Sequence, residues 1–451
     1  MIPCPKCGAE IEPSSRICPS CGQELDIEQA IEHFTRAILT NPEDYFAYGN
    51  RGKAYANIGQ LERAVQDYTN ALLLNPEDAV IYNNRGNVYA GLSDFHQAIK
   101  DYGEALRLNP HDEFSYNNRG NAYATIGQFE QAIQDYDEAL RLDPSDIDTY
   151  TNRGNAYATL GHFELAIKDY NETLQFNPLD SFTIKNRGNA YHNLGQLANA
   201  IQDYNESIRI NPEYTDALSD RGLAYQALEQ HEEAIRDYDQ AIILNPENSR
   251  SYYNRGNNYL ALRNHEQAIE NYEQAIILDP SYVDAYNNRG NAYANLDQLE
   301  LAIKDYSQAI KLNPRDNIAY RNRGLAYHNL EQYGRTLKHE KEDPDVHSDN
   351  NEPSHSNSWP INVHLIEQAI SDYTEAINLN PKDPVLYLNL GNAYLSLGKH
   401  EQAINNYTES IKLDPSDARS YYSRGFSYSE SGKPDEAERD FERARELGIG
   451  Q

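Results

Sequence analysis

Cysteine, methionine, tryptophan and positive charge are all scarce in this chain of 451 residues. It contains four Cys, one Met and one Trp, and 39 Lys plus Arg stand against 70 Asp plus Glu. The net charge is therefore −31 and the pI about 4.7. Such an acidic surface repels phosphate groups, so we expect neither nucleic acid nor an anionic membrane as a partner.

Long apolar runs, a secretion signal and catalytic motifs are missing as well. No apolar stretch approaches the roughly 20 residues of a membrane span. The N-terminus, MIPCPKCGAE, lacks the charged and then apolar segments of a signal peptide, so we expect a cytoplasmic protein. We find no phosphate-binding Gly-rich loop, nucleophile elbow or His-Glu-x-x-His helix, and therefore expect no enzyme.

A unit of 34 residues recurs instead, seen clearly in residues 113 to 146, EFSYNNRGNAYATIGQFEQAIQDYDEALRLDPSD. We number its places from Glu113 as place one. Places four, seven, eight and eleven share one helical face, and so do places twenty, twenty-four, twenty-seven and twenty-eight. Gly127 can end the first helix in a left-handed conformation, and Pro144 stops the second. Each unit is thus predicted to be a hairpin of helices A and B.

The spacing of Tyr116, Gly120, Tyr123, Ala132, Tyr136, Ala139 and Pro144 resembles the tetratricopeptide repeat (TPR). That resemblance implies an all-α fold, a right-handed superhelix (α-solenoid) whose A helices line a concave, polypeptide-binding groove. About eleven repeats are expected, with repeats one to eight in residues 45–316, repeat nine in 317–383 and repeats ten and eleven in 384–451. Repeat nine is longer than the others by 33 residues.

Tyrosine and arginine recur at fixed places of the repeat. Thirty of the 36 Tyr fall at places four, eleven and twenty-four, where we expect them to pack between helices. Place seven is Arg in ten of eleven copies, and place twenty-three is Asp in nine. The copy with Leu390 also has Asn406 in place of the Asp, so we predict an Arg–Asp pair within each repeat, such as Arg119 with Asp135.

Asparagine marks two further places of helix A, six and nine, which we call the Asn ladder. Both lie on the side of the helix away from its packed face, and an amide can both donate to and accept from a peptide group. The ladder is similar to the Asn rows of O-linked N-acetylglucosamine transferases, which grip peptide backbone. The predicted peptide-binding residues are Asn50, Asn84, Asn87, Asn118, Asn121, Asn152, Asn155, Asn186, Asn189, Asn254, Asn257, Asn288, Asn291, Asn322, Asn389 and Asn392.

The ladder also fits two roles that need no ligand: undiverged copying of the repeat, and bonding of the Asn side chains to the backbone of the adjacent repeat. A carboxylate-binding groove would need several cations, but only Lys53, Lys185, Arg250 and Arg321 are available there. We therefore expect a neutral, extended protein segment as the ligand.

The cysteines form two Cys-x-x-Cys pairs, Cys4 with Cys7 and Cys18 with Cys21. Four thiolates suit one tetrahedral, structural zinc ion, and residues 1–26 resemble a small zinc ribbon. A disulfide is the alternative. Residues 27–44 read as a B helix without an A helix, so the ribbon is predicted to cap the array, in preference to binding nucleic acid.

The other end of the array and repeat nine are also irregular. Glu438 and Arg445 replace apolar residues of the other repeats, which predicts a polar terminal cap and a monomer. Residues 333–363 are acidic, polar and Pro-bearing, and we expect a disordered insertion there. The four His in and next to it, including His364, have no metal-ligand spacing. Its Trp359 is a hypothetical docking motif or groove plug.

Three functions remain compatible with the sequence. The first is a non-catalytic interaction scaffold or assembly chaperone that binds extended polypeptide in an Asn-lined groove. The second is a regulatory adaptor that contacts its partners through the zinc ribbon and the acidic insertion. The third is an accessory subunit of an enzyme complex. The Asn ladder favours the first.

Overall fold

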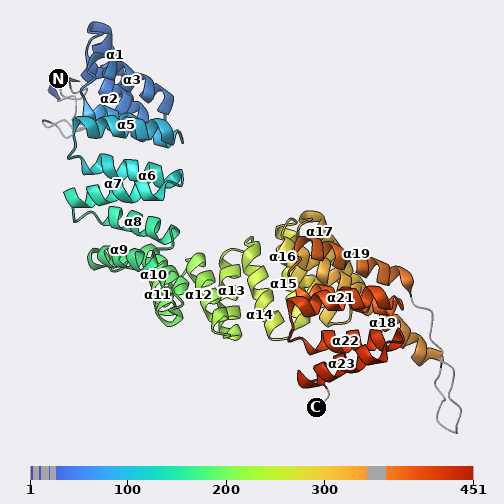
Figure 1. Cartoon of the computed structure of the whole chain (residues 1–451). Coiled ribbons are helices and arrows are strands. Elements are labelled where there is room, and N and C mark those ends of the chain that lie inside the picture. Colours follow the sequence, from blue (N-terminus) through green and yellow to red (C-terminus); the bar gives the residue numbers. More distant parts are fainter. Residues whose placement is uncertain (1, 4–9, 12–19, 21–26, 343–361, 450–451) are drawn as a thin grey trace, which may run out of the picture. The chain divides into compact units, whose positions relative to one another are not determined.

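The structure is a computed structural model that describes residues 2–3, 10–11, 20, 27–342 and 362–449; side chains are described only in 20, 27–333 and 362–449. Almost all of the described chain is α-helical, as predicted (Figure 1). Two short strands, β1 (Ile2–Pro3) and β2 (Glu10–Ile11), pair antiparallel near the N-terminus.

Helices alternate along the chain as A and B members of successive hairpins. The A helices are α2 (Tyr45–Asn57), α4 (Ala79–Gly91), α6 (Glu113–Thr125), α8 (Ile147–Thr159), α10 (Ser181–Asn193), α12 (Thr215–Ala227), α14 (Ser249–Ala261), α16 (Val283–Asn295), α18 (Asn317–Glu342), α20 (Pro384–Ser396) and α22 (Ala418–Glu430). The B helices are α1 (Ile27–Thr40), α3 (Leu61–Leu74), α5 (Phe95–Leu108), α7 (Phe129–Leu142), α9 (Phe163–Phe176), α11 (Leu197–Ile210), α13 (His231–Leu244), α15 (His265–Leu278), α17 (Leu299–Leu312), α19 (Val363–Leu379), α21 (His400–Leu413) and α23 (Pro434–Glu446).

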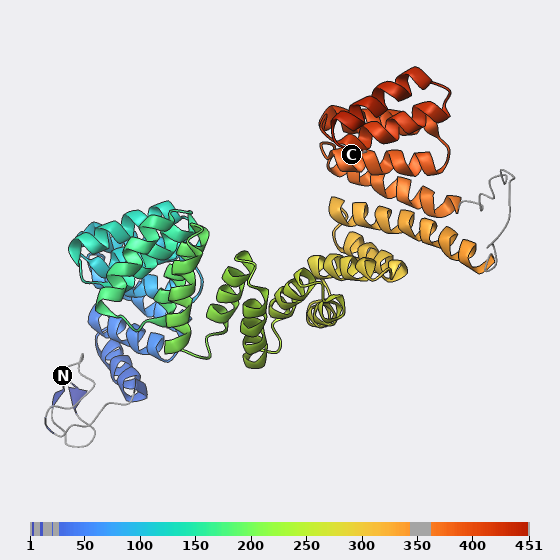
Figure 2. The same cartoon turned by 90° about the horizontal axis from the view of Figure 1, so that it is seen from below.

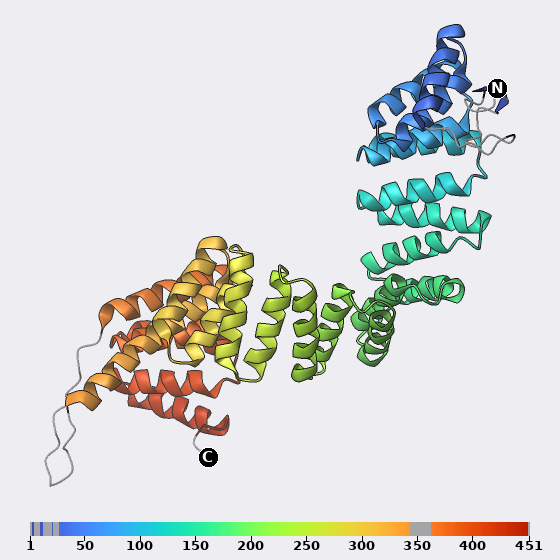
Figure 3. The ribbon, with the colours of Figure 1, turned by 180° about the vertical axis from the view of Figure 1, so that it is seen from behind.

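The chain divides into two compact units, Met1–Ala217 and Leu218–Gln451, and the division falls inside α12. Within each unit the helices follow one another in sequence order (Figure 3). Within each unit, the A helices other than α12 pack on their own B helix and on the B helix before it, as α6 does on α7 and α5. A helices of adjacent repeats also touch, as α6 and α8 do, which places them on the tighter side of the stack.

An aromatic ring and a Gly make the contact between the two helices of each repeat; the ring is Tyr in ten repeats and Phe441 in repeat eleven. The Tyr136 ring is buried in α7, and a Cβ added to Gly120 of α6 would lie 2.7 Å from that ring. The same relation recurs in the other repeats, for example between Gly154 and Tyr170. Gly at place eight is therefore required by the close approach of the helices, which offsets its poor helix propensity.

Short caps separate the helices. Asp78 begins α4 by accepting hydrogen bonds from the backbone N–H groups of Val80 and Ile81. Gly127 follows α6 with φ of +80°, as its predicted left-handed role requires. Ten of the eleven repeats have a positive φ at this place, and in four of them the residue is not Gly: Ser93, Glu229, Arg263 and Asp297.

Repeat nine departs from this pattern, and there one expectation is wrong. Helix α18 continues to Glu342, so the first part of the expected disordered insertion, residues 333–342, is helical (Figure 2). Glu331 occupies the place of the left-handed residue but lies inside the helix and is buried, so the turn that ends the other A helices does not form. Helix-favouring Glu and Lys residues then carry the helix onward. Trp359 lies outside the described residues.

Candidate functional site

The Asn ladder of the first unit lies on α2, α4, α6, α8 and α10. Its residues are half-buried, except for Asn87, which is exposed. Neighbouring repeats provide that burial, because adjacent A helices touch one another. The ladder therefore faces the tighter side of the stack, as the helical periodicity predicts.

Each Asn at place nine accepts a hydrogen bond from the buried Tyr of its own repeat. The distance from Tyr136 Oη to Asn121 Oδ1 is 2.7 Å, and that from Tyr170 Oη to Asn155 Oδ1 is 2.8 Å. The same bond is made by Asn87, Asn189, Asn257, Asn291 and Asn392. Burial raises the pKa of Tyr136, so the hydroxyl stays protonated and donates.

Four repeats lack this Asn and have Lys53, Leu223, Leu325 or Phe426 at place nine. In the two repeats that have Leu there, the buried Tyr is left without that acceptor. Leu325 stands at place nine of repeat nine, and the buried hydroxyl of Tyr373 makes no hydrogen bond within the described residues. Leu223 stands at place nine of repeat six, and the buried hydroxyl of Tyr238 makes no hydrogen bond of normal geometry within the described residues, although the Asn254 amide lies near it. These exceptions show that the Asn at place nine, and not another group of the helical hairpin, is the hydrogen-bond acceptor for the Tyr hydroxyl.

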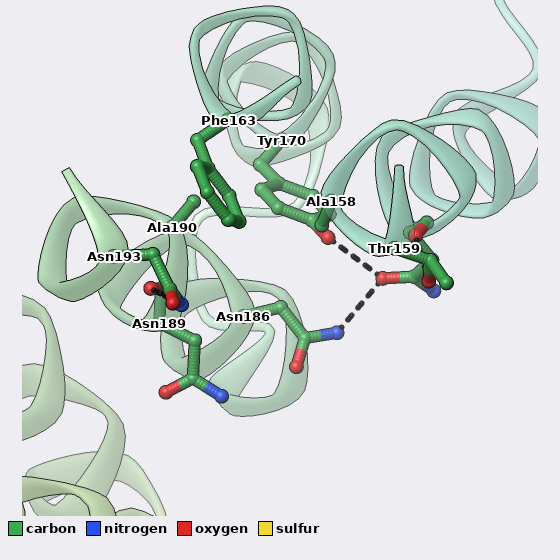
Figure 4. A pocket seen from close by; sticks show the side chains of 9 residues that line it. Ala158, Thr159, Phe163, Tyr170, Asn186, Asn189, Ala190 and Asn193 are labelled. Atoms are coloured by element: carbon green, nitrogen blue, oxygen red, sulfur yellow. Dashed lines mark hydrogen bonds between the residues drawn. The ribbon is translucent and has the colours of Figure 1, made fainter. Parts of the chain in front are cut away.

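Asn at place six reaches back to the preceding repeat. Asn186 Nδ2 donates to Asn155 Oδ1 at 3.0 Å, so Tyr170 and Asn186 share one acceptor (Figure 4). Asn288 and Asn322 make the equivalent bond. The alternative of inter-repeat bonding is therefore seen in the structure, but between side chains and not to backbone.

Asn118 and Asn152 instead donate to the place-five Asn of the preceding repeat, at 3.2 and 3.3 Å. Asn50 donates to a backbone carbonyl of its own helix, that of Phe46. Place six thus has a variable partner, whereas place nine has a constant one. No hydrogen bond fixes the side chains of Asn84 and Asn389 within the described residues, whereas the Asn254 amide lies near the Tyr238 hydroxyl.

In the central ladder amides that make an internal hydrogen bond, one half of the amide stays open. The Nδ2 groups of Asn121, Asn155 and Asn189 donate to no described residue, and the Oδ1 atoms of Asn118, Asn152 and Asn186 accept from none. The internal bonds hold the amides in fixed orientations. The ladder consequently presents donors and acceptors, which are the two groups that a peptide bond needs.

Two open pockets of about 300 and 280 Å³ lie along this face, one repeat apart. Each is lined by the ladder, by the buried Tyr and by the first aromatic residue of helix B, which is Phe129 in one pocket and Phe163 in the other. Figure 4 shows the pocket that contains Phe163. The sequence reasoning did not predict Phe129, Phe163, Thr159 or Asn193 as site residues. Thr159 and Asn193 lie at place thirteen, four residues beyond the ladder, and that spacing could have found them.

Arg–Asp pairs fix the positions of the ladder helices, as predicted. Arg119 Nε and Nη2 donate to the two carboxylate oxygens of Asp135, both at 2.7 Å, and nine repeats contain such a pair. Hydrogen bonding to Asp135 raises the pKa of Arg119. Burial raises the pKa of Asp135 against the opposing effect of the guanidinium. Both groups stabilise the packing of helix A on helix B.

Arg255 is the predicted exception. It donates to Asn271 at 2.7 Å and to Asp239 of the preceding repeat, so this arginine finds its carboxylate one repeat away. Several other arginines use Nη1 in the same direction, for example Arg153 toward Asp137. The arginines therefore join each A helix to two successive B helices.

The predicted zinc ligands Cys4, Cys7, Cys18 and Cys21 lie outside the described residues. Among the residues that are described, no group of His, Cys, Asp and Glu is placed to hold a metal ion. Within the same part of the chain, no helix combines the length and apolar character needed to cross a bilayer.

Comparison with known families gives matches along most of the chain. A model described as "TPR repeat" matches residues 52–93, 123–161, 188–229, 256–297, 366–398 and 391–432, and models described as "Tetratricopeptide repeat" match further segments. The chain therefore belongs to the tetratricopeptide repeat family, as the sequence indicated. A model described as "zinc-ribbon domain" matches residues 4–25.

Several solved structures are similar to parts of the chain. MamA is 27% identical over 38% of this chain and 92% of its own, with a TM-score of 0.35. YrrB, described as a TPR protein with an unusual peptide-binding site, is 25% identical over 41% of this chain and 95% of its own, with a TM-score of 0.37. A tetratricopeptide repeat protein from Parabacteroides merdae is 21% identical over 55% and 98%, with a TM-score of 0.45. No curated protein matches the chain.

Proposed function

We propose that this protein is a non-catalytic interaction scaffold that binds extended, uncharged polypeptide segments along its Asn ladder. The half-open amides of the ladder carry this proposal. Each place-nine oxygen is held by a Tyr hydroxyl, which fixes the amide and leaves its N–H groups directed away from the bond. A fixed donor loses little conformational entropy when a ligand binds.

The face also supports a ligand that approaches through its backbone. Amides recur with the period of the repeat, whereas a side-chain-specific site would need a different group at each step. Membership of the tetratricopeptide repeat family supports protein binding in general.

The decisive test replaces the open donor and keeps the internal acceptor. In the combined variant Asn121→Asp, Asn155→Asp and Asn189→Asp, a carboxylate oxygen still accepts from the Tyr hydroxyl, but the N–H groups are gone. Binding to an array of 12-residue peptides with blocked termini should fall at least ten-fold. Loss of one hydrogen bond to a ligand is worth about 1 kcal/mol, and three are removed.

A matched control adds the same three charges elsewhere. Gln66, Gln134 and Gln202 are exposed on B helices, so changing all three to Glu repeats the amide-to-carboxylate exchange away from the ladder. This control should bind like the wild type. If the ladder variant also binds like the wild type, the proposal is wrong. If it melts well below the control and loses binding only in proportion, the ladder is structural.

A further inference from the structure

A row of large apolar side chains lies beside the Asn ladder in the first unit. Place two of helix A precedes places six, nine and thirteen by four, seven and eleven residues, so all four places share one helical face. Place two is Phe46, Val80 and Phe114 in three consecutive repeats, and Phe182 in repeat five. We call these four residues the apolar row.

The apolar row is exposed to solvent. The exposed fractions are 63% for Phe46, 67% for Val80, 65% for Phe114 and 48% for Phe182. Single exposed apolar residues need no explanation, but a row of them on one face commonly marks an interaction surface. The packing of the repeat does not require these side chains, because place two is Asp148 in repeat four and Arg250 in repeat seven.

The same face carries little charge. Across places two, six, nine and thirteen of repeats one to five, Lys53 and Asp148 are the two charged residues among twenty positions, although 24% of the whole chain is charged. A ligand that carried several charges would leave them without partners here. The charge pattern therefore favours a neutral occupant.

Resting on the proposed function, we propose that the ladder face of repeats one to five selects uncharged, extended segments that bear aliphatic or aromatic side chains on one side. In an extended chain successive side chains point to opposite sides, so alternate residues can face the apolar row while the backbone meets the ladder amides. Repeats seven and eight carry Arg250 and Asp284 at place two and lack this selectivity.

Immobilised peptides of zero net charge with blocked termini test the selectivity on the full chain. One series of 12-residue peptides has Leu at every second position among Ser and Gly, and the other has Gln in place of Leu. The wild type should bind the Leu series at least ten-fold more than the Gln series. In the variant Phe46→Ser, Val80→Ser and Phe114→Ser this preference should drop below three-fold.

Leu39 and Leu73 provide the matched control. They are exposed by 77% and 78% but lie on the B helices α1 and α3. The variant Leu39→Ser with Leu73→Ser removes a similar exposed apolar surface, and it should keep the preference for the Leu series. Equal melting temperatures show that both variants are folded.

The outcomes separate this inference from the proposed function. If the row variant keeps the preference, or if the wild type binds both series equally and the ladder variant binds neither, the selectivity is wrong and peptide binding stands. If the wild type binds no peptide, both proposals fail. If light scattering shows that the wild type self-associates and the row variant is monomeric, the occupant is a second copy and the inference is overturned.

Discussion

At the scale of single residues, each Asn at place nine has two tasks under the proposed function. Its oxygen accepts from a tyrosine hydroxyl that would otherwise be buried without a partner, and its nitrogen would donate to the ligand. A buried unpaired polar group costs about 1–3 kcal/mol. Structural and binding roles of place nine are therefore compatible.

The Tyr–Asn hydrogen bond leads to a prediction, and the repeat that lacks this Asn provides the control. Tyr136→Phe removes a hydroxyl that donates to Asn121 and should lower the free energy of unfolding by about 1 kcal/mol. Tyr373→Phe removes a buried hydroxyl that has no acceptor in the described residues, and should be neutral or stabilising. The melting temperatures of the two variants give the comparison. Equal losses would contradict the assigned bond.

The position of the Asn ladder on helix A could be predicted from the sequence, but the hydrogen-bond partner of each amide could not. Periodicity placed the ladder on the side of helix A away from the packed Tyr, and the shared exception of Leu390 and Asn406 revealed the Arg–Asp pair. The bond between places nine and twenty-four depends on how deeply the Tyr136 side chain is buried between the two helices. That depth cannot be calculated from the sequence of one repeat. Place two was overlooked because its residues vary between apolar and charged.

At the scale of the helices, Gly at place eight decides how closely A and B approach. A Cβ added to Gly120 would lie 2.7 Å from the Tyr136 ring, so a larger residue does not fit there. The end of α18 was not predictable from the repeat pattern, because left-handed residues elsewhere include Ser93, Glu229 and Asp297. The presence of Glu331 at this place therefore did not indicate that helix α18 continues past it.

The Gly contact predicts opposite results for two similar substitutions. In Gly120→Ala the new Cβ would lie 2.7 Å from the Tyr136 ring, so the helices must shift, at a cost of about 1–3 kcal/mol. In Gly103→Ala on α5 the nearest atom is Arg119 Nη1 at 3.8 Å, an ordinary contact. That variant should gain up to about 1 kcal/mol of helix propensity.

Thermal melting of both Gly variants is the measurement. A lower melting temperature for Gly120→Ala and an unchanged or higher one for Gly103→Ala are expected. If both variants melt at the same temperature, the approach of α6 to α7 is looser than the structure gives.

At the scale of the whole molecule, stability is local because each repeat touches only its neighbours. Helix α1 packs on α2 and buries Phe34 and Ile38, yet no A helix precedes it among the residues that the structure describes. The zinc-ribbon match precedes it at residues 4–25. We propose that the ribbon holds one zinc ion through Cys4, Cys7, Cys18 and Cys21 and caps this end of the array.

Loss of the metal should therefore be felt at one end of the chain. Elemental analysis should find one zinc per chain, and chelation or the variant Cys7→Ser with Cys21→Ser should remove it. Hydrogen exchange should then speed up in α1 and α2 by ten-fold or more, because the capped face becomes exposed, while α20 to α23 exchange at unchanged rates. If exchange rises equally in both units, the array unfolds as one body and nearest-neighbour stability is wrong. If the metal leaves and α1 exchanges as before, the ribbon binds zinc without capping the array.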